Sequence, residues 1–174
     1  EETQKTVYFL RLEEIDKNIK EKIKEFKDEK AVLFYKNGEV AILEVDNSID
    51  LSNILKEYLK KDLEYFYIRG AITPKIIEAF INNRGSYEKI TLLAEDGTKF
   101  FLSSSLLDKA KLSGMEFQVL NKINLLFVTI NPHSPLGVDF NKEEFKSRLQ
   151  NEVSVPVINV LGDWLIWNLL MRIV

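Results

Sequence analysis

The stretch EYFYIRGAITPKIIEAF, from Glu64 to Phe80, sets the pattern of the fold. Its first residues are rich in aromatic and β-branched side chains and run to Gly70, which is typical of a β-strand. Thr73 and Pro74 then suit the N-cap and the first position of a helix. The apolar side chains that follow recur at helical spacing, namely Ile76, Ile77, Phe80 and Ile81. The stretch therefore predicts a strand followed directly by an amphipathic helix.

The same strand-then-helix order continues to about residue 160. Further strands are expected in KITLLA (89–94), EFQVL (116–120), INLLFVTI (123–130) and VPVINV (155–160), with helices over 103–112 and after Asn141. The predominantly apolar run INLLFVTI is typical of a central parallel strand that is covered on both faces. Residues 64–160 therefore predict an α/β fold with a mostly parallel, Rossmann-like sheet.

The residues before this region predict an α+β lead-in that begins with a strand over TVYFLRL, residues 6–12. A helix is expected where Ile15, Ile19, Ile23 and Phe26 share one face, and its charged residues are assigned to solvent. In KAVLFYKNGEVAILEV, residues 30–45, two apolar runs flank Asn37-Gly38. This pair favours the positive φ angles of a type I′ turn, so the stretch predicts a β-hairpin. Residues 1–62 either extend the later sheet or form a small subdomain, before a domain over 63–160 and a hydrophobic tail over 161–174.

Composition narrows the class of protein. The chain has 174 residues, of which 45% are hydrophobic and 29% charged, as in ordinary globular proteins. Its net charge of -3 gives no electrostatic case for binding nucleic acid. The absence of cysteine excludes disulfides and iron–sulfur clusters and is compatible with a cytoplasmic location, which we expect.

The apolar tail LGDWLIWNLLMRIV, residues 161–174, is shorter than the roughly 20 residues that a membrane span needs. No membrane association is therefore expected. We expect the tail to pack against the domain or to dock on a second copy of the chain, giving a homo-oligomer.

Polar residues gather at three of the expected strand ends. Ligands in open α/β sheets bind beyond the carboxyl ends of the strands, so these groups are candidates for ligand binding. They are Arg69, Gly70, Thr73, Asp96, Thr98, Lys99, Asn131, His133 and Ser134. Arg69 and Lys99 would hold an anionic group, helped by the partial positive charge of the helix that begins after Thr73. The plainer alternative is that these are turn residues, a helix cap and an exposed histidine.

Several familiar sites are missing from the sequence. It contains neither G-x-x-x-x-G-K-[ST] nor G-x-G-x-x-G, the phosphate-binding loops of P-loop and dinucleotide-binding proteins. It also lacks the G-x-S-x-G elbow of α/β-hydrolases. A single histidine without cysteine argues against a catalytic zinc site. We therefore expect no cofactor, metal site or ATP hydrolysis in this chain, and assign no catalytic residue.

Three segments together resemble a known family. The segments are YIRGAITPKIIEAF, TLLAEDGTKFFLS and INLLFVTINPHSPLGVDFNKEEF…VPVINV. Over about residues 65–160, their order and spacing are similar to those of the C-terminal region of bacterial P-loop proteins associated with reactivation of lysine 5,6-aminomutase. That pattern runs through R-G-A-[IL]-T, D-G-T-K, A-V-T-V-N-P-x-S-P-x-G and P-V-x-D-V. Asn159 stands where the pattern has Asp, and the tail from Leu161 matches nothing in it.

The resemblance implies an accessory role. Members of the family carry an amino-terminal domain with a Walker A lysine, so this chain is expected to be a piece of a longer protein. The aminomutases use adenosylcobalamin and pyridoxal phosphate, and a reactivase is similar to a chaperone that uses ATP to exchange damaged cobalamin. The present residues would then contact the cobalamin-dependent aminomutase or an ATPase partner subunit, or join protomers. The competing hypothesis is a domain that binds a small anionic ligand, or an enzyme of unknown reaction, with its pocket at the strand ends.

Overall fold

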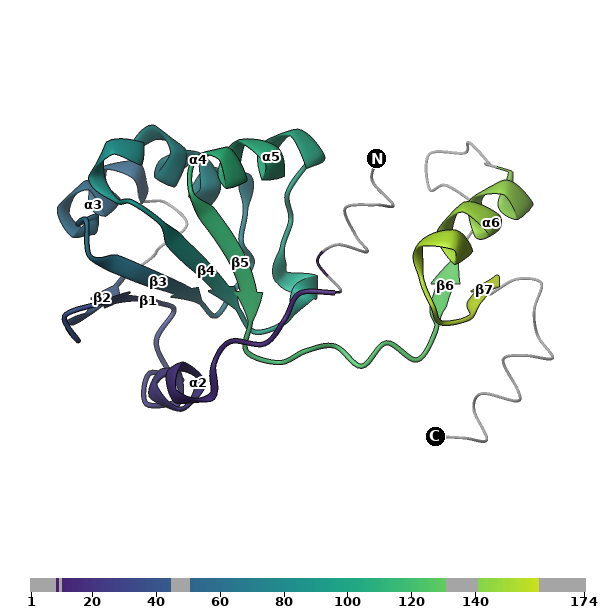
Figure 1. Ribbon diagram of the computed structural model, residues 1–174, viewed down its shortest axis with the longest axis horizontal. Helices are drawn as coiled ribbons and strands as arrows, with labels where there is room; N and C mark the ends of the chain where they lie inside the picture. The colour runs from purple at the N-terminus through teal and green to yellow at the C-terminus, as the bar shows by residue number, and fades with distance from the viewer. Residues whose placement is uncertain (1–8, 10, 45–50, 131–140, 160–174) are drawn as a thin grey trace. The chain divides into compact units, whose positions relative to one another are not determined.

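The computed structural model describes residues 9, 11–44, 51–130 and 141–159. The chain divides into two compact units, residues 1–123 and 124–174 (Figure 1). This boundary falls inside the range 63–160 that the sequence predicted as one domain. The lead-in and the first part of that range belong together because their strands share one sheet.

The first unit is built on a five-stranded sheet with the strand order β2-β1-β3-β4-β5. The strands are β1 (Ala31–Tyr35), β2 (Val40–Leu43), β3 (Leu63–Ile68), β4 (Ile90–Ala94) and β5 (Met115–Val119). β1 pairs antiparallel with β2 and β3, whereas the pairs β3–β4 and β4–β5 are parallel. The predicted α/β class is therefore confirmed, but the sheet is mixed, because the lead-in hairpin joins its edge.

Helices cover both faces of this sheet. Figure 1 shows α3 (Leu51–Tyr58), α4 (Pro74–Asn82) and α5 (Ser104–Leu112) along one face and α2 (Lys17–Lys24) on the other. Two short 3₁₀ helices, η1 (Arg84–Ser86) and η2 (Gly97–Lys99), lie between the larger elements.

The core of the first unit has two parts because side chains alternate between the faces of a strand. Towards α3–α5, Phe66 packs on Phe80 with ring centroids 5.1 Å apart. Towards α2, Ile23 belongs to a second cluster with Tyr67 and Leu93. All five residues of β4 are buried, which explains its uninterrupted apolar sequence.

The predicted hairpin is confirmed, but its predicted turn type is wrong. Val40 pairs with Phe34 and Leu43 with Ala31 in antiparallel register. Gly38 has a φ of +89°, and no non-glycine residue in the described ranges has a positive φ, whereas a type I′ turn needs two. The Gly38 N–H donates to the Tyr35 carbonyl at 2.9 Å, which indicates a three-residue loop with glycine in the left-handed position.

The helix starts follow the sequence closely. Thr73 is the N-cap of α4 and Pro74 follows it, although the Thr73 side chain makes no capping hydrogen bond. The Ser103 hydroxyl accepts a hydrogen bond from the Leu106 N–H and so caps α5. Asn141 caps α6 (Lys142–Glu152) by accepting from the N–H groups of the second and third helical residues.

The second unit contains a two-stranded parallel sheet, β6 (Val128–Ile130) and β7 (Val157–Asn159), joined by α6. The prediction that residues 123–130 form a long central strand is therefore wrong. Only three residues of this run are in a strand, and Leu126 is 57% exposed. Its apolar composition does not come from burial on both faces of a central sheet.

Two further expectations concern the ends of the chain. The strand expected over 6–12 lies mostly outside the described residues, and the described Phe9 is helical. The following segment instead forms a parallel bridge at the edge of β5, where Glu14 pairs with Val119. The tail 161–174 lies outside the described residues, so its packing stays a prediction.

Candidate functional site

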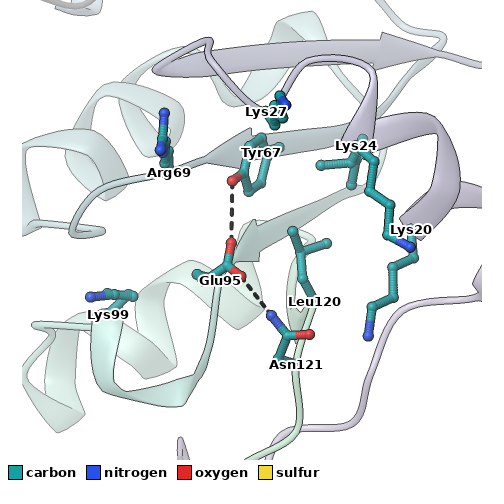
Figure 2. A pocket seen from close by; sticks show the side chains of 10 residues that line it. Lys20, Lys24, Lys27, Tyr67, Arg69, Glu95, Lys99, Leu120 and Asn121 are labelled. Carbon is teal, nitrogen blue, oxygen red and sulfur yellow. Dashed lines mark hydrogen bonds between the residues drawn. The ribbon is translucent and has the colours of Figure 1, made fainter.

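A pocket of about 460 Å³ lies in the first unit at the carboxyl ends of the parallel strands (Figure 2). The volume is in the usual range for small-molecule sites, roughly 300–1,000 Å³. One wall comes from α2 and the turn after it, and the other from the residues that follow β3, β4 and β5. The lining residues are Lys20, Ile23, Lys24, Lys27, Tyr67, Arg69, Glu95, Lys99, Leu120 and Asn121.

Strand register explains why side chains from neighbouring strands meet here. Tyr67 of β3 is the register partner of Leu93 of β4, and both belong to the cluster under α2. Arg69 and Glu95 each follow two residues later, so the alternation of the strand directs them to the same face. Both line the pocket.

Backbone hydrogen bonds fix the chain where the strands end. The Arg69 N–H donates to the carbonyl of Lys30 at 3.0 Å, and the Asn121 N–H donates to that of Glu95 at 2.9 Å. Lys99 ends η2, and its carbonyl accepts from the Ile72 N–H at 2.8 Å. This contact ties η2 to the segment between β3 and α4.

The helical wall contributes three lysines, Lys20, Lys24 and Lys27. Their spacing of four and then three residues places them along one side of α2 and its following turn. Ile23, only 2% exposed, anchors the helix to the sheet beside them.

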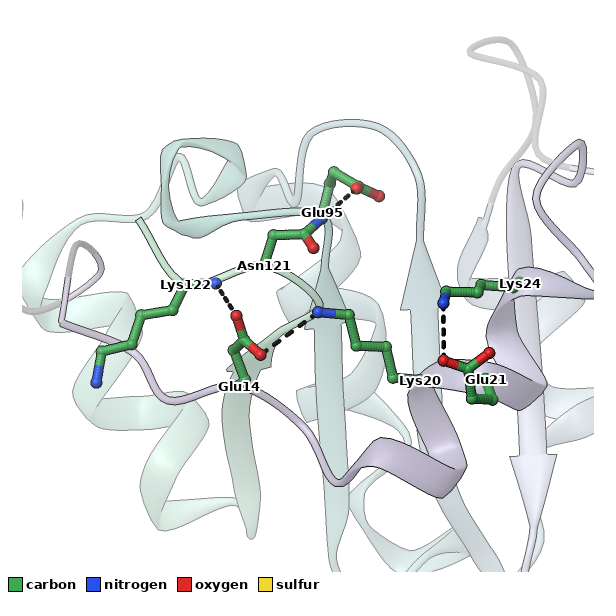
Figure 3. A network of polar contacts seen from close by, with 7 residues as sticks. All are labelled: Glu14, Lys20, Glu21, Lys24, Glu95, Asn121 and Lys122. Atoms are coloured by element: carbon green, nitrogen blue, oxygen red, sulfur yellow. Dashed lines mark hydrogen bonds and ion pairs between the residues drawn. The ribbon is translucent and has the colours of Figure 1, made fainter. Parts of the chain in front are cut away.

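Two of these lysines already have acidic partners (Figure 3). The ammonium group of Lys20 lies 3.4 Å from a carboxylate oxygen of Glu14, and that of Lys24 lies 2.7 Å from Glu21. The hydrogen bond from the Lys122 N–H to Glu14, followed by that from Lys20, holds the pKa of the Glu14 carboxyl below its ordinary value. Both pairs are solvent-exposed, so they are screened and easily exchanged.

Glu95, the single carboxylate among the described residues that line the pocket, is held by two neutral donors. The Tyr67 hydroxyl donates to its Oε2 at 3.4 Å, and Asn121 Nδ2 donates to its Oε1 at 2.5 Å (Figure 2). Burial raises the pKa of the Tyr67 phenol, and the charge of Glu95 adds to the rise. Tyr67 therefore stays protonated and can donate at neutral pH.

The charges of the pocket do not balance. Among the described residues, its lining has five cations, Lys20, Lys24, Lys27, Arg69 and Lys99, against one carboxylate, that of Glu95. Within the described part of the chain, Lys27, Arg69 and Lys99 make no ion pair. An excess of unpaired cations around one hollow attracts anions.

The structure brings only some of the predicted site residues into the pocket. Arg69 and Lys99 line the pocket together, as the anionic-ligand hypothesis expected. Asp96 and Thr98 do not line it; Asp96 instead accepts hydrogen bonds from the N–H and the hydroxyl of Thr98 and so caps η2. Two of the remaining five candidates, Gly70 and Thr73, are not among the lining residues. The other three lie outside the described residues, namely Asn131, His133 and Ser134.

The sequence did not predict Tyr67, Glu95, Asn121 or the lysines of α2 as residues of the site. The sequence does contain a pattern that points to Glu95. Side chains alternate between the two faces of a strand, so Glu95, two residues after Leu93, lies on the same face as Leu93, whereas Asp96 lies on the opposite face. The charged residues of an amphipathic helix are expected to face solvent, and the helical pattern does not say which strands the helix crosses.

Comparisons with models of protein families, with curated proteins and with solved structures gave no match. In the described ranges, no three His, Cys, Asp or Glu side chains gather as a metal ion would require. The helices in these ranges are also too short or too polar to cross a lipid bilayer. The pocket is therefore interpreted from its own geometry.

Proposed function

We propose that the first unit binds an anionic small molecule in the pocket at the carboxyl ends of β3, β4 and β5. The observation that carries this proposal is that Lys27, Arg69 and Lys99, from three separate elements, line one pocket without an ion-pair partner among the described residues.

The chemistry of these groups supports an oxyanion as ligand. The guanidinium of Arg69 presents a planar set of donors that matches two oxygens of a carboxylate or phosphate. Lys99 and Lys27 add point charges with freely rotating donors. Lys20 and Lys24 become available when a ligand displaces their exposed partners. The geometry supports binding and assigns no reaction.

Isothermal titration of the intact chain with pyrophosphate tests the proposal. The doubly substituted variant R69Q/K99Q is expected to bind about tenfold more weakly, because it loses two charge-assisted contacts that are partly screened by solvent. Higher salt should weaken binding to the unsubstituted chain.

Lys36→Gln is the matched control for this titration. It removes one positive charge from the exposed hairpin loop, where β1 ends beside the start of β3, away from the pocket. Its affinity should stay unchanged. No binding of pyrophosphate, or equal losses in R69Q/K99Q and Lys36→Gln, would contradict the proposal.

The accessory role in reactivation of lysine 5,6-aminomutase stays a prediction, because it rests on the resemblance over residues 65–160 alone. It implies contact with the aminomutase or with an ATPase partner subunit. Sedimentation of the chain with purified lysine 5,6-aminomutase tests it. A complex is expected, and separate boundaries at micromolar concentrations would contradict the role.

A further inference from the structure

The carboxylate of Glu95 would be unfavourable in a pocket whose only role is to attract anions. Its carboxylate lines the same hollow as five cationic side chains and repels any anionic ligand. It is nevertheless held in place by the Tyr67 hydroxyl and the Asn121 amide, one on each carboxylate oxygen. A group fixed in this way has a defined direction and so can select among ligands.

The bonding of Glu95 leaves acceptor capacity free. An ionised carboxylate offers about four lone-pair positions, and Tyr67 and Asn121 use one on each oxygen. Each oxygen therefore keeps a position for a donor on the ligand. Two adjacent acceptors match two neighbouring donors.

The surrounding charges determine what kind of donor fits. An ammonium group on the ligand would be repelled by the five cations of the lining, which outnumber the one carboxylate. A hydroxyl group carries no charge, so the cations do not repel it. The partner of Glu95 is therefore a hydroxyl group rather than an amine.

The unpaired cations determine the anionic group. A phosphate monoester carries a charge of roughly -1.5 to -2 at neutral pH and three acceptor oxygens. A single carboxylate has one charge and two oxygens. A phosphate therefore offers an oxygen for each of Lys27, Arg69 and Lys99, which line the same pocket, whereas a carboxylate has one oxygen too few.

We infer that the ligand is a hydroxyl-bearing phosphate monoester of the sugar-phosphate type, with its phosphate at Lys27, Arg69 and Lys99 and its hydroxyl groups at Glu95. This inference rests on the proposed function and specifies its ligand class. A free sugar phosphate and a ribonucleotide share this chemistry.

Titration calorimetry of the intact chain with matched probes tests the inference. Ribose 5-phosphate is expected to bind about tenfold more tightly than methyl phosphate, since its hydroxyl groups reach a charged acceptor. 2-Deoxyribose 5-phosphate should fall between them. Adenosine 5′-monophosphate separates the sources: tighter binding than ribose 5-phosphate indicates a ribonucleotide, and equal or weaker binding a free sugar phosphate.

Glu95→Gln shows whether the discrimination comes from this residue. In this variant the preference for ribose 5-phosphate over methyl phosphate should fall to near one. Methyl phosphate itself should bind as tightly as before or more tightly, because a negative charge is removed. Retained methyl phosphate binding also shows that the variant is folded.

Two results separate failure of this inference from failure of the proposed function. Equal affinity for ribose 5-phosphate and methyl phosphate in the unsubstituted chain, or a preference that survives in Glu95→Gln, overturns the inference and leaves anion binding in place. If neither methyl phosphate nor pyrophosphate binds, the proposed function fails and the inference fails with it.

Discussion

Substitution of Gly114 by alanine tests the fold at the junction between α5 and β5. Gly114 has a φ of +80°, in the left-handed region that disfavours any residue with a Cβ. A Cβ at this position would lie 2.8 Å from the backbone oxygen of Glu88. That oxygen belongs to the main chain just before β4, so the contact cannot be relieved by turning a side chain.

Substitutions at two other glycines separate the conformational cost of a Cβ from its steric cost. Gly38 has a φ of +89°, but a Cβ there would meet nothing within 4 Å, so Gly38→Ala isolates the conformational cost of about 1–2 kcal/mol. Gly70 has neither a positive φ nor a neighbour within 4 Å, and Gly70→Ala should change the free energy of unfolding by less than about 1 kcal/mol. Gly114→Ala adds a steric cost to the conformational one, for a total of about 2–4 kcal/mol.

Urea unfolding of the three variants, followed by circular dichroism at 222 nm, measures these differences. The expected order of destabilisation is Gly114→Ala, then Gly38→Ala, then Gly70→Ala. Equal losses in Gly114→Ala and Gly38→Ala would refute the close approach to Glu88. A loss in Gly70→Ala as large as that in Gly38→Ala would refute the role of the positive φ.

Three other predictions follow from the sequence and the fold. Burial raises the pKa of Tyr35 and of Tyr87 to about 12, whereas the phenols of the unfolded chain have a pKa near 10. As pH rises, the unfolded chain therefore loses these protons before the folded chain does. The free energy of unfolding should fall between about pH 10 and pH 12. Tyr87→Phe should make this alkaline loss shallower in urea titrations, and an unchanged slope would speak against it. The chain should not hydrolyse ATP; phosphate release above background that is lost in Lys99→Ala would contradict this. The tail 161–174 should pack on the domain or on a second copy, and a version ending at Val160 that sediments and melts like the intact chain would exclude both.

Local patterns in the sequence predicted the elements well. The strand and helix around Thr73, the hairpin at Gly38 and the helix that begins after Asn141 all depend on contacts a few residues apart, and all are present. The wrong prediction of a central strand over 123–130 shows what local patterns cannot predict. An apolar run indicates burial but not the strands with which it pairs, and that choice depends on distant parts of the chain.

The site was predictable only in part for the same reason. Arg69 and Lys99 follow strands and could be chosen from the position of those strands. Glu95 is found only when the alternation of β4 is continued one residue beyond the end of the strand, whereas the polar turn residues favour Asp96. The lysines of α2 required knowledge that this helix crosses the ends of the parallel strands, which only the folded chain shows.

Amide chemical shifts of the ¹⁵N-labelled intact chain during titration with pyrophosphate test the central claim most directly. The pocket is predicted to show the largest shifts, at Arg69, Glu95, Lys99 and Asn121 and along α2. The hairpin loop around Lys36, where β1 ends, should change little. Shifts that are absent, or that are as large at Lys36 as at Arg69, would contradict an anion-binding pocket at the ends of β3, β4 and β5.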